Sequence, residues 1–222
     1  MLRDPVRYAI RYAITDRSQL GSSEPERRSA LRTLAARWAA AGIDFIQLRE
    51  KDLPAHELLQ LCRQLRSVLV AQGSRTRLLL NSGQDLPRAV EIARAAQLDG
   101  LHLTSSWATQ TNAPVPTELR ANFTHLSAAQ PATISISCHS IAEVTAAAAA
   151  QVDLILFGPI FGKQISGETI HLGVGLETLA AACQAAGPIP VLALGGITHA
   201  NTASCLTAGA AGIAAIRLFA AP

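Results

Sequence analysis

Eight short apolar runs, separated by longer stretches of helical composition, are the feature that most constrains the fold of this chain. The runs are rich in Ile, Val and Leu, which is typical of parallel strands buried on both faces. Alternation of strand and helix along the whole chain indicates an α/β protein with a parallel sheet. The expected strands occupy residues 8–15, 43–49, 77–81, 98–103, 133–139, 152–158, 189–196 and 212–218.

The stretches between these runs are expected to form helices. Pro54 opens the clearest of them, in which Leu58, Leu61, Leu65 and Leu69 recur every three or four residues and therefore share one face. Eight strand–helix units in 222 residues fit a closed barrel better than a doubly wound open sheet, which is the alternative fold. Further helices are expected over residues 26–41, 85–96, 140–150, 176–186 and 198–208.

We therefore expect residues 1–222 to form a single (β/α)8 TIM-barrel domain. Two parts depart from the regular alternation. Residues 158–175 form a long, Gly-rich, polar connection, and a loop of that length is usually a lid or a binding loop. The sequence also ends soon after the eighth expected strand, so a full last helix is expected to be lacking. Residues 1–7, or a partner subunit in a homodimer, would then cover the last strands.

Composition excludes several classes of protein. The chain is 49% hydrophobic and 16% charged, which excludes the disordered classes. Its formal net charge of +3 comes from scattered residues, which fits a small anionic ligand and gives no dense stripe for nucleic acid. No apolar run reaches the roughly 18 residues that a membrane span needs. Arg3, Asp4, Arg7 and Arg11 interrupt the N-terminal segment, so no secretory signal is expected.

The cysteines are widely spaced and include no CxxC pair, so neither a disulfide framework nor a zinc site is expected. We expect buried free thiols in a cytoplasmic protein, because free cysteine usually behaves as a small core residue. The residues concerned are Cys62, Cys138, Cys183 and Cys205.

Polar residues follow several expected strands, at the end of a barrel where active sites lie. Gly195 and Gly196 lead from the seventh strand into a helix. Glycines let the backbone approach an anion closely, and a helix N-terminus presents free N–H groups. We predict a phosphate site here, to which Arg217 adds a charge-assisted hydrogen bond. The alternative is a tight turn with Arg217 as a solvated surface residue.

A second anionic group is expected near Arg49 and Lys51, which follow the second expected strand. Their side chains suit a carboxylate or a diphosphate. The alternative is that they form ion pairs with Glu50 or Asp52. Two further residues at the ends of the second and third strands are assigned to substrate binding: Gln47 and Asn81.

His139 is the candidate acid/base, because it follows the fifth expected strand and imidazole titrates nearest neutral pH. The alternative is a structural histidine. Cys138, the residue before it, is expected to point the opposite way, into the helix layer.

These segments together resemble the thiamine phosphate synthase/TenI family from about residue 12 to residue 219. Each motif is moderately specific alone, and their order along the chain makes the resemblance strong. It implies a (β/α)8 barrel that handles a phosphorylated thiazole. The motifs are AITDR (13–17), FIQLREKD (45–52), Asn81, DGLHL (99–103), SCHSIAEV (137–144), DLILFGPIF (153–161), PVLALGGIT (190–198) and AGAAGIAAI (208–216).

One branch of this family joins a pyrimidine diphosphate to thiazole phosphate and expels pyrophosphate. The resemblance implies Mg²⁺ held by carboxylates, because diphosphate leaves poorly until its charge is neutralised. Synthases carry an Asp after the Asn of the third strand and another after the fourth strand. Here residues 81–83 read Asn-Ser-Gly and residues 104–107 read Thr-Ser-Ser-Trp. Asp85 lies near but is displaced, and Lys163 stands alone where synthases carry a Thr-x-Thr-Lys run.

The TenI branch resembles an aminothiazole tautomerase that needs no metal, and it carries a Ser-x-His-Ser run that residues 137–140 match. On this basis we expect a TenI-type thiazole tautomerase, an isomerase without a cofactor. His139 would transfer the proton, Arg49 or Lys51 would bind the substrate carboxylate, and Asn81 would orient the ring. The glycine turn and Arg217 would hold the phosphate.

Two alternatives stay open. The first is a divergent thiamine phosphate synthase, a transferase whose Mg²⁺ is held by Asp85 or by the substrate alone. The second is a non-catalytic barrel that binds thiazole or thiamine phosphate. In each case the expected partner is a small phosphorylated thiazole, and neither nucleic acid nor a membrane is expected.

Overall fold

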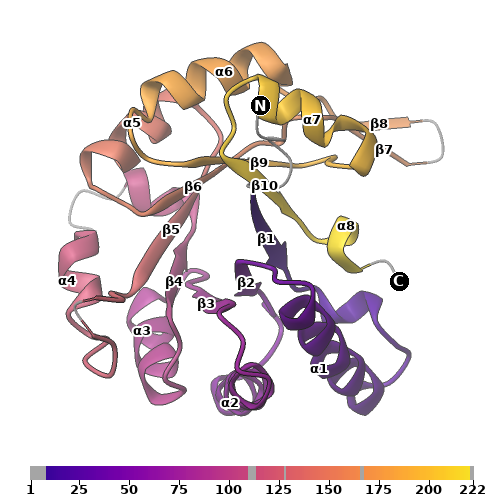
Figure 1. Cartoon of the computed structure of the whole chain (residues 1–222), viewed down its shortest axis with the longest axis vertical. Coiled ribbons are helices and arrows are strands. Elements are labelled where there is room, and N and C mark those ends of the chain that lie inside the picture. The colour runs from indigo at the N-terminus through magenta and orange to yellow at the C-terminus, as the bar shows by residue number, and fades with distance from the viewer. Residues whose placement is uncertain (1–8, 110–113, 128, 166–167, 221–222) are drawn as a thin grey trace, which may run out of the picture.

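The computed structural model of the chain describes residues 9–109, 114–127, 129–165 and 168–220. Its centre is a closed barrel of parallel strands in the order β1-β10-β9-β6-β5-β4-β3-β2 (Figure 1). The closed barrel confirms the expected fold class, and the open sheet is excluded. The strands are β1 (Ile10–Ile14), β2 (Phe45–Leu48), β3 (Arg77–Asn81), β4 (Gly100–Leu103), β5 (Thr133–Cys138), β6 (Leu154–Phe157), β9 (Val191–Leu194) and β10 (Gly212–Ala215).

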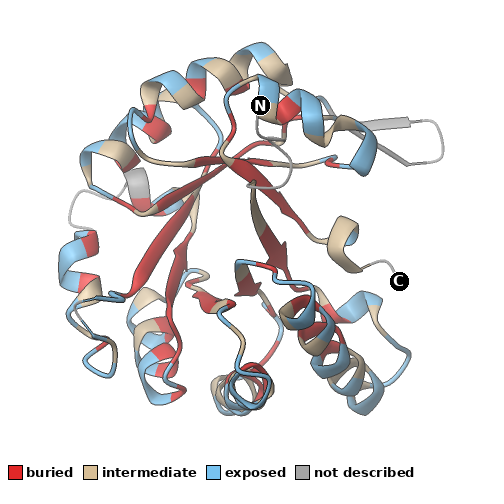
Figure 2. Cartoon of the chain, in the orientation of Figure 1, coloured by how far each residue is buried: buried red, intermediate tan, exposed pale blue. Residues whose placement is uncertain are grey.

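Helices surround this barrel (Figure 1). In Figure 2 their buried residues face the strands and their exposed residues face outward. This is the burial expected of amphipathic helices on a buried sheet. They are α1 (Glu24–Ala40), α2 (Ala55–Ala71), α3 (Leu86–Ala95), α4 (Pro116–Arg120), α5 (Ile141–Ala149), α6 (Gly175–Ala185), α7 (His199–Thr207) and α8 (Arg217–Ala220), with 3₁₀ turns η2 (Arg17–Gln19) and η3 (Ser105–Thr109).

Side-chain alternation along each strand divides the core into two parts. Leu48 on β2 and Leu80 on β3 face the helices, where they join the larger hydrophobic cluster with the inward faces of α1 and α2. Tyr12 on β1 and Leu79 on β3 face the barrel interior, where they pack with apolar residues of the opposite strands. Residues of strand tips that face the interior therefore line the mouth of the barrel.

The helices begin where the sequence supplies the right end groups. In α1, Ser23 and Glu26 form a capping box, and Pro25 stands at the start of the helix. In α2, Leu61 and Leu65 are fully buried, as their spacing predicts. The predicted helices all occur, with ends within two residues of those expected.

The connection 158–175 was expected as a loop, and it contains two short antiparallel strands, β7 (Lys163–Ile165) and β8 (Glu168–His171). The last helix is short, as expected, and α8 packs on α1 through a hydrogen bond of 2.6 Å from Trp38 Nε1 to the carbonyl oxygen of Phe219. The predicted cover by residues 1–7 lies outside the described residues.

Two smaller expectations concern the cysteines and the membrane. Cys62, Cys138 and Cys205 are buried and Cys183 is half-buried, and all are free thiols. Cys138 packs in the cluster between strands and helices, as its position predicts. Within the described residues, no helix has the length and apolar character to cross a membrane.

Candidate active site

The C-terminal ends of the parallel strands meet at one mouth of the barrel, where the predicted site residues gather. Gln47 and Arg49 stand at the end of β2, Asn81 ends β3, His139 follows β5, and Gly195 follows β9. Because all strands of the barrel are parallel, these residues lie on the same rim.

The glycine turn after β9 is packed closely against the loop that follows β6. Gly195 and Gly196 have φ angles of +94° and +66°, a region that side chains disfavour. A Cβ at Gly195 would lie 2.6 Å from Pro159, and one at Gly196 would lie 2.7 Å from Phe161 Cβ. The N–H of Phe161 also donates to the carbonyl oxygen of Gly195 at 3.1 Å. The tight turn proposed as the alternative is therefore real, and it brings the β6 loop onto the end of β9.

Free N–H groups nevertheless follow this turn. Thr198 caps α7, and its side chain accepts from the N–H of Asn201 at 3.3 Å. The N–H groups of Gly196, Ile197 and His199 have no hydrogen-bond partner among the described residues. Such groups at a helix N-terminus attract an anion. The tight turn and the phosphate site are thus compatible.

Arg217, the proposed addition to this site, begins α8 directly after β10. Its side chain is exposed and forms no ion pair with any described residue. Strand β10 pairs with β9, so Arg217 follows the end of the strand next to the one that leads into the glycine turn. Its share in phosphate binding stays a prediction.

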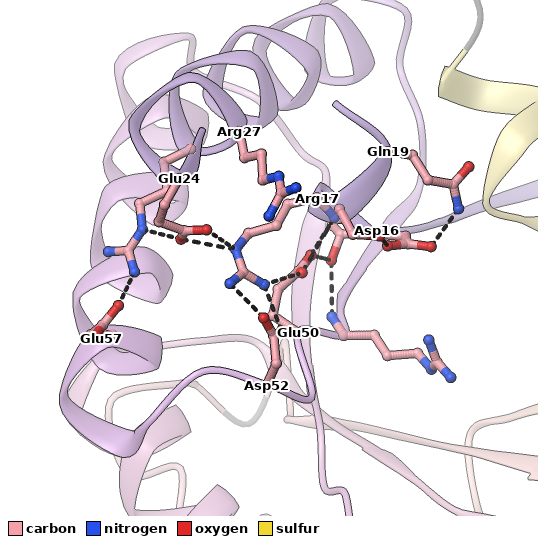
Figure 3. A network of polar contacts seen from close by, with 12 residues as sticks. Asp16, Arg17, Gln19, Glu24, Arg27, Glu50, Asp52 and Glu57 are labelled. Carbon is pink, nitrogen blue, oxygen red and sulfur yellow. Dashed lines mark hydrogen bonds and ion pairs between the residues drawn. The ribbon is translucent and has the colours of Figure 1, made fainter. Parts of the chain in front are cut away.

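Arg49 and Lys51 form no ion pair within the described part of the chain. The acids beside them are bound by Arg17 instead (Figure 3). Nη1 of Arg17 lies 3.0 Å from Glu50 Oε2, and the same guanidinium binds Asp52 at 2.7 Å. The ion pairing with Glu50 or Asp52 proposed as the alternative is therefore wrong, and the charge of Asp16 acts on Arg49 without an ion pair between the two.

Gln47 points into the barrel from β2, where it is 1% exposed. Its Oε1 atom is buried and has no hydrogen-bond partner among the described residues. An unsatisfied buried acceptor costs about 1–3 kcal/mol, and such atoms are rare in native proteins. This atom is therefore a candidate acceptor for a ligand in the mouth.

A polar chain that the sequence analysis did not predict crosses the barrel interior. The Tyr12 hydroxyl lies 3.1 Å from Ser135 Oγ and 3.3 Å from His102 Nδ1. His102 Nδ1 also lies 2.9 Å from Ser135 Oγ, and its Nε2 lies 2.9 Å from Ser137 Oγ. Ser137 is half-buried near the end of β5, so the chain runs from the closed interior to the mouth.

Burial lowers the pKa of His102 to about 3, and the positive charge of Arg49 adds to this effect. His102 is therefore neutral at physiological pH. Burial also raises the pKa of Tyr12, so its hydroxyl keeps its proton.

His139, the predicted acid/base, is exposed at the rim after β5. Its Nδ1 lies 2.5 Å from the carbonyl oxygen of Gly158, and its backbone N–H donates to Glu143 at 2.5 Å. Since a carbonyl only accepts, Nδ1 carries the proton and Nε2 is left for another partner. The structure thus fixes the ring at the rim next to the β6 loop.

Asn81 and Asp85 shape the turn after β3. Asn81 Oδ1 accepts from the N–H of Gly83 at 3.0 Å, and Asp85 Oδ1 accepts from the N–H of Arg88 at 3.1 Å. Asp85 is therefore the N-cap of α3, and its carboxylate faces the backbone of that helix. A cleft of about 440 Å³ beside this turn is lined by residues that include Lys51, Asn81, Ser82 and Asp85.

The part of the chain that the structure describes does not offer a set of protein ligands for a metal ion. Among the described residues there is no cluster of three His, Cys, Asp or Glu side chains that could hold one. Asp85 is engaged as a helix cap, and Glu50 is engaged by Thr15 and Arg17. The carboxylates that the resemblance implies are thus not replaced nearby.

The fold and this rim define a (β/α)8 barrel with basic and amide groups suited to phosphorylated small molecules. A family model described as thiamine monophosphate synthase matches residues 11–219. This chain belongs to that thiamine phosphate synthase/TenI family, as its motifs indicate.

Relatives agree with this assignment. A Geobacter sulfurreducens protein, provisionally named thiamine-phosphate synthase, is 38% identical over 208 residues, covering 92% of this chain and 84% of that protein. The thiamine-phosphate synthase of Methanoculleus marisnigri is 33% identical, covering 92% and 84%. The solved structure of thiamine phosphate pyrophosphorylase from Pyrococcus furiosus matches with a TM-score of 0.66 at 24% identity. The match covers 97% of this chain and 90% of the Pyrococcus chain, and it supports the fold.

These names correct the expected activity. Relatives that are 29–38% identical carry the name of the synthase, which is a transferase. The expected thiazole tautomerase, an isomerase, is therefore wrong. The run at residues 137–140 matches the TenI pattern locally, but the comparisons over the whole chain do not favour that branch.

Proposed function

We propose that this chain is a transferase of the thiamine-phosphate synthase type, which joins a pyrimidine diphosphate to a thiazole phosphate and releases pyrophosphate. The observation that carries the proposal is a pair of separate anion-binding features on one rim. Arg49 and Lys51 stand free after β2, and free N–H groups follow Gly195 after β9. Strands β1 and β10 lie between them, so the features can bind two substrates at once.

Each feature has a role in this proposal. The N–H groups of Gly196 and Ile197 bind the thiazole phosphate, with Arg217 beside them as a further cation. Arg49 and Lys51 bind the diphosphate, whose charge they partly neutralise before it leaves. His139, in the form protonated at both ring nitrogens, gives its Nε2 proton to the departing pyrophosphate, while Nδ1–H stays on the carbonyl oxygen of Gly158.

Two amide side chains complete the proposed site. Gln47 Oε1 accepts a hydrogen bond from substrate inside the mouth, which satisfies this buried atom. Asn81 fixes the turn after β3 through its Oδ1 and offers its N–H groups to the ring. We propose that Mg²⁺ enters with the diphosphate as part of the substrate, and the chain itself holds no cofactor.

The test is an activity assay on the purified wild-type chain and on a variant, followed by chromatography of the products. Pyrimidine diphosphate, thiazole phosphate and Mg²⁺ should give thiamine phosphate and an equal amount of pyrophosphate. The variant with Arg49→Ala and Lys51→Ala should lose this activity and keep its fold by circular dichroism. Binding of both substrates without any product would overturn the proposal and indicate a non-catalytic binder.

A further inference from the structure

Arg17 is a buried cation that binds three carboxylates, one on α1 and two in the segment after β2. It stands on η2, and its side chain is 4% exposed. Nε contacts Glu24 of α1 at 3.0 Å, Nη1 contacts Glu50 at 3.0 Å, and Asp52 accepts from Nη1 and Nη2 at 2.7 and 2.8 Å (Figure 3). Only the forked guanidinium can serve all of these directions together.

The two acids after β2 alternate with the two free cations. The order is Arg49, Glu50, Lys51, Asp52, so each acid adjoins Lys51 in the sequence. Glu50 is directed inward, where it also accepts from Thr15 Oγ1 at 2.5 Å. Its side chain is 3% exposed, and that of Asp52 is 70% exposed.

The same contacts hold the backbone of this segment. Thr15 Oγ1 accepts from the N–H of Arg49 at 2.9 Å, and Glu50 accepts from the N–H of Arg17 at 3.2 Å. Arg17 lowers the pKa of Asp52, while burial raises the pKa of Glu50 against the hydrogen bonds from Thr15 and Arg17. The geometry keeps both acids facing Arg17, since Glu50 accepts from Thr15 and Arg17 and Asp52 accepts from Arg17.

We propose that Arg17 is a positioning residue that binds Glu50 and Asp52 and thereby leaves Arg49 and Lys51 free for an anionic ligand. The inference rests on the proposed function in one respect, namely that the ligand at these cations is a diphosphate. Without Arg17, Asp52 is the exposed acid nearest to Lys51 in the sequence and competes with the ligand for it. Removal of one charge-assisted contact in this way weakens ligand binding about tenfold.

The experiment measures the affinity of inorganic pyrophosphate by calorimetry, in the full chain and without the second substrate. Asp52→Asn is made in two backgrounds, the wild type and the double variant Arg17→Met with Glu50→Gln. The double variant removes a buried cation together with its buried partner, so it avoids leaving an unpaired buried charge. Circular dichroism and urea unfolding verify that each variant is folded.

We expect Asp52→Asn to leave the pyrophosphate affinity of the wild type within about twofold, because Arg17 already holds that carboxylate. In the double variant, Asp52→Asn should raise the pyrophosphate affinity about tenfold and so recover the affinity lost with Arg17. An equal gain in both backgrounds would show a general effect of charge and overturn the role of Arg17. Unchanged affinity in the double variant would overturn it as well.

Failure of the proposed function gives a different result. If the wild type binds pyrophosphate and makes no thiamine phosphate, the proposed transferase activity is wrong. The comparison of Asp52→Asn in the two backgrounds still decides the role of Arg17. If the wild type does not bind pyrophosphate, the free-cation site itself is wrong, and the proposal for Arg17 falls with it.

Discussion

Nε2 of His102 lies 2.9 Å from Oγ of Ser137, and this contact connects the closed interior of the barrel with its mouth. On the other side of the ring, Nδ1 faces two hydroxyl groups, those of Tyr12 and Ser135. When one of them donates to Nδ1, the neutral ring donates from Nε2, and Ser137 is left with its own proton for a ligand. A buried imidazole can in this way orient a hydroxyl group at the site.

The buried His102 should make the stability of the protein depend on pH. Its pKa is about 3 in the folded state, against 6.5 as the ordinary value. Below about pH 6.5 the unfolded chain therefore binds a proton that the folded chain refuses. The contribution of His102 to the free energy of unfolding is therefore fully present above that pH. It falls by about 1.4 kcal/mol per pH unit as the pH decreases towards 3.

Urea unfolding of the wild type and of His102→Gln at about pH 7 and about pH 5 measures this effect. The variant should be less stable at neutral pH, and the difference should shrink in acid. His56→Gln is the matched control, since that side chain is 82% exposed. A difference between wild type and His102→Gln that is the same at both pH values would contradict the assignment.

Gln47→Met should separate stability from binding. Oε1 of Gln47 is buried without a partner, so replacing the amide with an apolar side chain of similar size removes an unsatisfied group. We expect the free protein to gain about 1 kcal/mol of unfolding free energy, while the KM of the substrate that contacts this residue rises about tenfold. Urea unfolding and steady-state kinetics test the two effects. Loss of stability would show that Gln47 already has a partner in the folded protein.

The barrel and the place of its rim follow from sequence because both depend on local patterns. Apolar runs such as residues 77–81 mark strands, and the spacing of Leu61 and Leu65 marks a helix face. Once the strands are parallel, residues after their ends must share a rim, as Asn81 and His139 do.

The polar contacts of Arg17 and His102 could not be predicted from local sequence patterns, because they join residues far apart in the sequence. Arg17 binds acids 33 and 35 residues away, whereas a local reading pairs those acids with Lys51. His102 stands within an apolar strand, and its partners come from β1 and β5. The activity was predicted wrongly because residues 81–83 and 104–107 lack the carboxylates of synthases and residues 137–140 match the TenI run, whereas relatives over the whole chain carry the synthase name.

Asp85→Asn should leave the Mg²⁺ dependence of thiamine phosphate formation unchanged. The Asp85 side chain caps α3, and asparagine is an equally good N-cap, so the helix is preserved. If the divalent ion enters with the diphosphate, the Mg²⁺ concentration for half-maximal rate stays the same. Asp85→Ala, which removes the cap, should cost about 1 kcal/mol of stability with no change in that concentration. A rise in the Mg²⁺ requirement of Asp85→Asn would instead make Asp85 a ligand.

Gly196→Ala tests the glycine turn, where backbone conformation and close packing act together. The residue has a φ angle of +66°, and a Cβ there would lie 2.7 Å from Phe161 Cβ. Gly73→Ala is the matched control, because Gly73 has a φ angle of +58° and nothing within 4 Å of the added atom. Both variants bear the left-handed strain of about 1–2 kcal/mol.

Only Gly196→Ala must also push the β6 loop away, which should cost about 1–3 kcal/mol more. That movement shifts the free N–H groups of the turn, so the KM for thiazole phosphate should rise about tenfold in this variant alone. Urea unfolding and steady-state kinetics of both variants provide the comparison. Equal destabilisation by the two substitutions would show that Phe161 yields without cost. A thiazole phosphate KM that stays at the wild-type value would remove the turn from the phosphate site.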